Sequence, residues 1–170
     1  MKFAIPFILL FFLLIPGLSI SQDNSSGKEF EKDTTILIGK VERNILQQGD
    51  FGKYFKEEYK NYQPCTNTIQ QLKNKVYENS IVIVLATWCH DSQEQVGRFY
   101  KILDLLDYNT NMVATICLDK NKLAGELDIS SYDVKLVPTF IFYNELKETG
   151  RITESPNASL EKDILQILNQ

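Results

Sequence analysis

The chain has 170 residues, of which 22 are acidic and 18 are basic, so its formal net charge near pH 7 is −4. An acidic chain without any cluster of basic residues argues against nucleic acid as a partner. Hydrophobic residues make up 44% of the sequence, which is enough for one domain with a buried core, and three cysteines are too few for a disulfide-stapled scaffold.

The first 21 residues have the pattern of a cleavable secretory signal peptide. Lys2 supplies a positive charge, residues 7–15 form an apolar core, and Ser19 and Ser21 are small residues at the −3 and −1 positions of a cleavage site. The core is shorter than the roughly 20 residues of a membrane-spanning helix. We therefore expect a periplasmic or secreted protein with no stable membrane insertion after cleavage. An uncleaved anchor is the alternative.

Behind the signal, residues 22–33 are polar and are expected to form a flexible tether, which leaves residues 34–170 as a single domain. In chain order the pattern of this domain predicts a short strand at 36–41, helices at 49–62 and 66–77, a strand at 81–86, a helix at 89–106, a strand at 112–118, a loosely helical connection at 120–132, strands at 139–143 and 149–153 that form a hairpin around Asn144-Glu145, and a last helix capped by Ser159.

The run Ile81–Ala86 contains no polar residue, so it should be a central strand that is covered on both faces. The aromatic residues of 49–62 recur at a spacing of four, which is typical of a helix face that packs into a core. Strands that alternate with helices before a terminal hairpin and helix predict an α/β fold, a three-layer α/β/α sandwich with a central mixed sheet.

The sequence Trp88-Cys89-His90-Asp91-Ser92 follows the central strand and opens a helix, and Val137-Pro138-Thr139 begins a later strand. This layout resembles the thioredoxin superfamily over most of the chain. The resemblance implies a thioredoxin-like fold and a cis peptide bond before Pro138. It also implies that Pro138, with Val137 and Thr139, lines a groove for substrate, beside a site that includes Trp88. A trans proline that opens an edge strand is the alternative.

Two positions depart from the family pattern. Ser92 stands where a thioredoxin has its second cysteine, and Ile83 stands where a thioredoxin buries an acid that assists that cysteine. The site is therefore expected to have a single thiol. Trp-Cys-x-Asp-Ser, together with Gly150-Arg151-Ile152 and the later Glu154 and Pro156, resembles a less studied group of secreted bacterial thioredoxin-like proteins with no secure activity.

Cys89 is the expected nucleophile, because the first turn of a helix favours the thiolate form of a cysteine. His90, the only histidine, would stabilise a thiolate when protonated, whereas Asp91 would oppose it, so we expect a moderately acidic thiol. The alternatives are an inert buried thiol and a surface histidine without a role. One histidine with scattered cysteines is not a ligand set, so we expect no metal and no cofactor.

Cys65 precedes a helix that leads into the central strand, which predicts that it lies at the same sheet edge as Cys89. It is a possible resolving thiol if the two Cα atoms lie within about 7 Å, although an unpaired Cys65 is the default. Cys117 falls inside a strand and is expected to be an apolar filler.

Two functions remain open. The first is thiol–disulfide exchange by a single cysteine, which would form mixed disulfides and isomerise or reduce substrates with an external thiol as resolver. Its partners would be thiol- or disulfide-containing proteins or small thiols. The alternative is a non-catalytic module that holds extended peptides beside Pro138.

Overall fold

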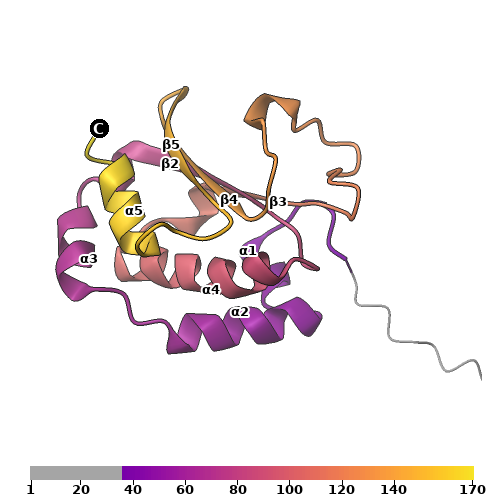
Figure 1. Cartoon of the computed structure of the whole chain (residues 1–170), viewed down its shortest axis with the longest axis horizontal. Helices are drawn as coiled ribbons and strands as arrows, with labels where there is room; N and C mark the ends of the chain where they lie inside the picture. The colour runs from indigo at the N-terminus through magenta and orange to yellow at the C-terminus, as the bar shows by residue number, and fades with distance from the viewer. Residues whose placement is uncertain (1–35) are drawn as a thin grey trace, which may run out of the picture. The chain divides into compact units, whose positions relative to one another are not determined.

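The computed structural model describes residues 36–170, drawn in colour in Figure 1. The predicted signal peptide (1–21) and tether (22–33) lie outside the described residues. In the described part, no helix is long and apolar enough to cross a membrane.

The elements follow the predicted alternation of strands and helices. Their bounds are β1 (Gly39–Lys40), α1 (Arg43–Leu46), α2 (Gly49–Asn61), α3 (Thr66–Leu72), β2 (Asn79–Leu85), α4 (His90–Leu105), β3 (Val113–Cys117), β4 (Thr139–Asn144), β5 (Lys147–Thr153) and α5 (Leu160–Ile167), with short 3₁₀ turns at Val76–Glu78, Thr110–Met112 and Ser130–Tyr132.

The five strands form one mixed sheet in the order β1-β3-β2-β4-β5. Strand β2 is parallel to β3 and antiparallel to β4, while β1 and β5 are antiparallel edge strands. All residues of β2 except Ser80 are buried, as expected for a central strand with both faces covered. The predicted α/β sandwich with a mixed sheet is confirmed.

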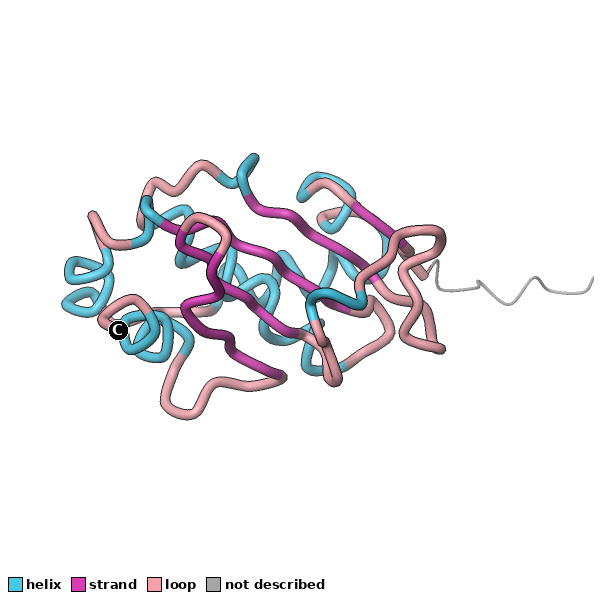
Figure 2. Tube along the Cα trace, turned by 90° about the horizontal axis from the view of Figure 1, so that it is seen from above, coloured by secondary structure: helices cyan, strands magenta, loops and turns pink. Residues whose placement is uncertain are grey.

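The two faces of the sheet are covered differently. Ile81, Ile83 and Leu85 point from β2 into a core shared with the five described α-helices, whereas Val82 and Val84 point into a second cluster beneath the segment 119–137. Figure 1 shows the helices on one side of the sheet and this orange segment on the other. In Figure 2 the segment covers the end of the sheet where β2 and β3 finish. The second covering layer is therefore an irregular segment with one 3₁₀ turn, where a loosely helical connection was predicted.

Helices α2 and α4 approach closely at Gly97. A Cβ atom on this residue would lie 2.4 Å from the carbonyl oxygen of Phe55, so only glycine permits this approach. Beside the crossing, the rings of Phe55 and Tyr100 lie 5.5 Å apart, and Phe99 of α4 stacks on Phe140 of β4 at 4.3 Å. These contacts fix α4, and with it the start of the helix, against the sheet.

Two predicted boundaries were wrong, and one predicted cap makes no hydrogen bond. Helix α3 ends at Leu72 rather than near 77, because the chain leaves the helix and Asn74 adopts a left-handed backbone conformation with φ +69°. The hairpin turn is Glu145-Leu146, one residue later than expected. Ser159 holds the N-cap position of α5 as predicted, but its side chain makes no capping hydrogen bond.

Candidate functional site

The turn between β2 and α4 is held in place by three hydrogen bonds. The N–H of Cys89 donates to the carbonyl of Ala86 at 3.0 Å, the indole Nε1 of Trp88 donates to the carbonyl of Leu118 at 3.3 Å, and Nε2 of Gln93 donates to the carbonyl of Thr87 at 3.0 Å. Cys89 thereby occupies the N-cap position of α4, with extended backbone angles of φ −86° and ψ 129°. The first turn of a helix leaves backbone N–H groups without intrahelical partners.

The thiol of Cys89 lies directly against the segment that precedes β4. Its Sγ is 3.2 Å from the carbonyl oxygen of Val137, to which the S–H donates a hydrogen bond. The peptide bond between Val137 and Pro138 is cis, the isomer that the resemblance implies. The structure therefore brings together Cys89, Val137 and Pro138, three of the residues expected at the site. The Cys89 side chain remains half-exposed.

Ser92 and Thr139 serve as internal hydrogen-bonding groups. Ser92 is fully buried, and its Oγ accepts a hydrogen bond from the backbone N–H of Ala86 at 3.2 Å. Thr139 is also buried, and its hydroxyl donates to the carbonyl of Leu136 at 2.7 Å. Neither side chain faces solvent. Thr139 was expected to line a groove, but its hydroxyl instead binds the backbone of the segment that precedes β4.

Trp88 and His90, the residues on either side of Cys89 in the sequence, are both exposed. Trp88 is 37% exposed and forms one wall of a pocket of about 410 Å³, together with Phe51 and Tyr54 of α2. His90 is exposed, and its imidazole makes no hydrogen bond or ion pair with any residue of 36–170. The imidazole is therefore near Cys89 in sequence but has no partner that fixes its direction.

Ile83 is fully buried in the helix-side core, at the position where the resemblance would place an acid. Cys117 lies in the same core, and burial raises the pKa of its thiol to about 12. Cys117 is therefore protonated and enclosed, as expected for an apolar filler. Among residues 36–170, no group of three or more histidine, cysteine or carboxylate side chains could hold a metal ion.

Cys65 does not lie at the edge of the sheet that carries Cys89. Tyr62 lies close to Cys65 in the sequence, and the centroid of its ring is 5.6 Å from the guanidinium carbon of Arg98. Arg98 lies about 13 Å further along α4 than Cys89, so the chain beside Cys65 is near the middle of that helix and not near its start. The N–H of Cys65 donates to a carboxylate oxygen of Glu161 in α5 at 3.2 Å. Figure 1 shows α3 and the start of α4 at opposite ends of the view.

The expected placement failed because the connection from α2 carries α3 onto the first turn of α5. Both Cys65 and Cys89 are free thiols. Cys65 is exposed, and hydrogen bonds from the side chain and backbone of Thr68 lower the pKa of its thiol. The geometry gives it no route to resolve a disulfide at Cys89 within the same chain.

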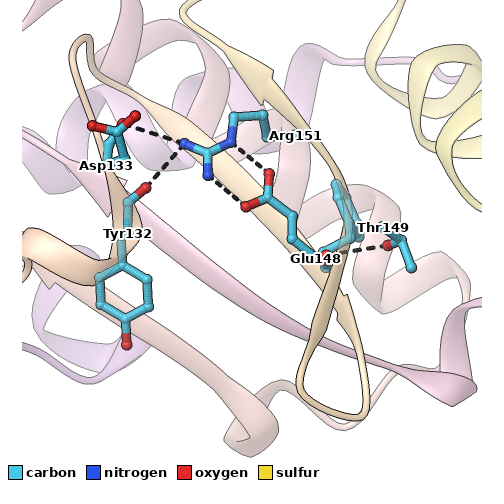
Figure 3. A network of polar contacts seen from close by, with 6 residues as sticks. Tyr132, Asp133, Glu148, Thr149 and Arg151 are labelled. Carbon is cyan, nitrogen blue, oxygen red and sulfur yellow. Dashed lines mark hydrogen bonds and ion pairs between the residues drawn. The ribbon is translucent and has the colours of Figure 1, made fainter.

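Sequence reasoning missed the network that holds the segment 132–138 beside Cys89. Nη1 of Arg151 donates to the carbonyl oxygens of Tyr132 at 3.0 Å and Asp133 at 3.5 Å, as Figure 3 shows. At the other end of the segment, the N–H of Glu154 donates to the carbonyl of Pro138 at 2.7 Å. The acceptors are backbone carbonyls, which every residue type carries, so the sequence contains no signal for these contacts.

The comparisons leave the function open. No family model matches the chain, and no curated protein matches it. Among solved structures, it is similar to a protein of unknown function, PA1234, from Pseudomonas aeruginosa, with 15% identity, a TM-score of 0.47, and coverage of 70% of this chain and 80% of that one. It is also similar to an HIV epitope scaffold, with 15% identity, a TM-score of 0.43, and coverage of 69% and 72%.

Proposed function

We propose that the protein carries out thiol–disulfide exchange with Cys89 as its single attacking thiol. One observation carries the proposal: a half-exposed thiol caps the start of α4 beside the segment that precedes β4. The unpaired N–H groups at a helix start favour a negative charge there, which promotes the thiolate that attacks disulfides. The N-terminal pattern of residues 1–21 supports an exported, oxidising location for this chemistry.

The reaction has a single-thiol form. The thiolate of Cys89 attacks one sulfur of a substrate disulfide, a new S–S bond forms at Cys89, and the other substrate sulfur leaves as a thiolate. Ser92 has no sulfur, so a thiol of the substrate or a small external thiol must attack the mixed disulfide and release Cys89. Isomerisation of protein disulfides, or their reduction by an external thiol, follows from this sequence of steps.

The segment before β4 is suited to an extended substrate backbone. Its carbonyls at Lys135, Leu136, Val137 and Pro138 accept hydrogen bonds from within the chain. The N–H groups of Leu136 and Val137 have no acceptor within residues 36–170. Backbone N–H groups require a partner, and a substrate carbonyl would supply one beside Cys89.

The same N–H groups favour the second candidate, a module that binds extended peptides without chemistry at Cys89. Exposed apolar side chains of Trp88 and Leu136 beside the segment would contribute contact area to either function. The two candidates differ only in whether Cys89 forms a covalent bond with the partner.

Trapping of mixed disulfides separates the two candidates. The purified Cys65→Ser variant, in which Cys89 is the only accessible thiol, is mixed with a peptide that contains one disulfide and is analysed by mass spectrometry. Exchange predicts a peptide adduct at Cys89, which is absent when Cys89→Ser is added. A non-catalytic module instead predicts equal binding of the reduced peptide with and without Cys89→Ser, and no adduct.

A further inference from the structure

We propose that Arg151 is a positioning residue for Cys89, acting through the segment 132–138. Arg151 touches neither Cys89 nor any expected substrate. It holds the far end of the segment whose Val137 carbonyl accepts the hydrogen bond from the Cys89 thiol. The predicted effect of Arg151 on the rate of disulfide exchange rests on the proposed function. Its predicted effect on the reaction of Cys89 with a small alkylating reagent does not.

The guanidinium of Arg151 is shared between a carboxylate and two backbone carbonyls. Its Nε and Nη2 bind the two oxygens of Glu148, which lies three residues earlier on β5, with the Nε contact at 2.6 Å. Its Nη1 is thereby directed to the carbonyls of Tyr132 and Asp133 on the facing segment (Figure 3). The Arg151 and Glu148 side chains are only 29% and 31% exposed. The bidentate pair fixes the guanidinium plane, so the third nitrogen has one direction in which to donate.

The carbonyls that Arg151 binds lie where the segment reverses direction. Asp133 ends the 3₁₀ turn Ser130–Tyr132 in a left-handed conformation with φ +45°, an uncommon state for a residue other than glycine. Four residues further on, Val137 reaches Cys89. Strand β5 and the residue that follows it thus hold the segment at both ends, through Arg151 at Tyr132 and Asp133 and through the N–H of Glu154 at Pro138.

A lysine at position 151 could not make the same set of contacts. One ammonium group can pair with Glu148, but it lacks the planar fork that binds a carboxylate with two nitrogens and a carbonyl with a third. Loss of the third contact frees the Tyr132–Asp133 turn, and the Val137 carbonyl moves away from the Cys89 thiol. The S–H···O hydrogen bond exists only in the thiol form, so its loss makes the thiolate more accessible to a small reagent. A peptide substrate, which needs an ordered segment, should instead react more slowly.

The test compares Arg151→Ala and Arg151→Lys with Arg98→Ala, all in the Cys65→Ser background. Arg98 is a matched control, because it also pairs with carboxylates, those of Glu58 and Glu94, and is 27% exposed, but it makes no hydrogen bond to residues 132–138. Three quantities are measured at one pH: the thermal unfolding midpoint, the rate of Cys89 alkylation by iodoacetamide, and the rate of mixed-disulfide formation with the peptide.

Both alanine variants should lower the unfolding midpoint, since Arg151→Ala removes the partner of Glu148 and Arg98→Ala removes the partner of Glu58 and Glu94. Only the two Arg151 variants should raise the alkylation rate, by about threefold, the factor that one hydrogen bond of ordinary strength contributes. They should also slow mixed-disulfide formation, by roughly fivefold, since the reacting groups are less well aligned. General destabilisation of the fold would not raise the alkylation rate of Cys89 and at the same time lower its rate of mixed-disulfide formation.

The proposal is overturned if Arg151→Lys alkylates at the rate of the parent protein, or if Arg98→Ala changes the alkylation rate as much as Arg151→Ala does. Arg151→Lys retains the charge and therefore decides the question if Arg151→Ala does not fold. If the parent protein forms no mixed disulfide at all, the proposed function fails, yet the alkylation rates still test the positioning role.

Discussion

The buried Oγ of Ser92 accepts a hydrogen bond from the backbone N–H of Ala86 at 3.2 Å, so the residue three positions after Cys89 stabilises the turn beneath that thiol. This contact joins the first turn of α4 to the end of β2. A cysteine in place of Ser92 would therefore lose part of that stabilisation.

Ser92→Cys should recreate two thiols three positions apart at the start of a helix and permit a Cys89 disulfide. Sulfur is a weak acceptor, so the variant should lose roughly 1 kcal/mol of unfolding free energy. It should gain reduction of insulin disulfides with a dithiol donor, incompletely, because Ile83 supplies no carboxylate. Insulin turbidity measures the gain.

The matched control for that gain is the double variant Ser92→Cys with Cys89→Ser, which should be inactive. If Ser92→Cys folds and forms its disulfide but shows no turnover above background, the peptide-binding module is favoured over exchange.

The three cysteines should react with a thiol reagent in a fixed order in the native protein. Cys65 is exposed with a lowered pKa and Cys89 is half-exposed, so both should label, whereas Cys117, with its pKa raised to about 12, should label only after unfolding. Peptide mapping after timed labelling measures the order. Faster labelling of Cys117 than of Cys89 would contradict the assignment of the site.

Asp104 should make the stability of the fold depend on pH in the acid range. Burial alone would raise the pKa of Asp104, but the hydrogen bonds from Arg43 and Tyr59 outweigh it and lower the pKa below the ordinary value of 3.8. A carboxyl with a lowered folded pKa stabilises the native state above its unfolded pKa, and this contribution is lost as the pH falls through the folded value.

Asp104→Asn should therefore cost about 2 kcal/mol of unfolding free energy near pH 6, and the difference from the parent protein should shrink below about pH 4. Urea unfolding across this range measures it. Glu57→Gln, which changes an exposed carboxylate on α2, serves as the control and should have little effect at any pH. A difference for Asp104→Asn that is constant from pH 6 to pH 3 would refute the assignment.

Gly97→Ala should destabilise the α2–α4 crossing. The added Cβ would lie 2.4 Å from the carbonyl oxygen of Phe55 and 3.1 Å from the backbone nitrogen of Tyr59, so the helices must separate. We expect a loss of about 3 kcal/mol in chemical denaturation, because the clash is with backbone atoms that cannot rotate away. A loss below about 1 kcal/mol would show that the helices move apart more easily than the packing indicates.

The parts of the fold that depend on local pattern could be predicted from the sequence. Strand β2 is a run of apolar residues, and α4 repeats its buried positions with helical spacing, so both were placed within one or two residues. The proximity of Val137 to Cys89 was implied only by the resemblance to the thioredoxin superfamily, and the sequence pattern alone did not predict it.

The remaining errors concern long-range geometry. The route of the chain between α2 and α3 depends on packing of Tyr62 and Cys65 against Glu161, a contact between residues almost a hundred positions apart. The segment 119–137 is held by contacts such as the one from Lys122 Nζ to the carbonyl of Lys135 at 2.6 Å. A backbone acceptor has no residue preference, so the sequence pattern cannot identify it.

The central claim is that the fold activates Cys89, and one rate comparison tests it directly. The second-order rate constant for reaction of Cys89 with a small aromatic disulfide is measured at neutral pH in the Cys65→Ser variant. The same constant is measured for an unfolded peptide of residues 86–95. The proposed function predicts a faster reaction in the folded protein, because the start of α4 favours the thiolate. A folded-protein rate equal to or below that of the peptide would contradict it.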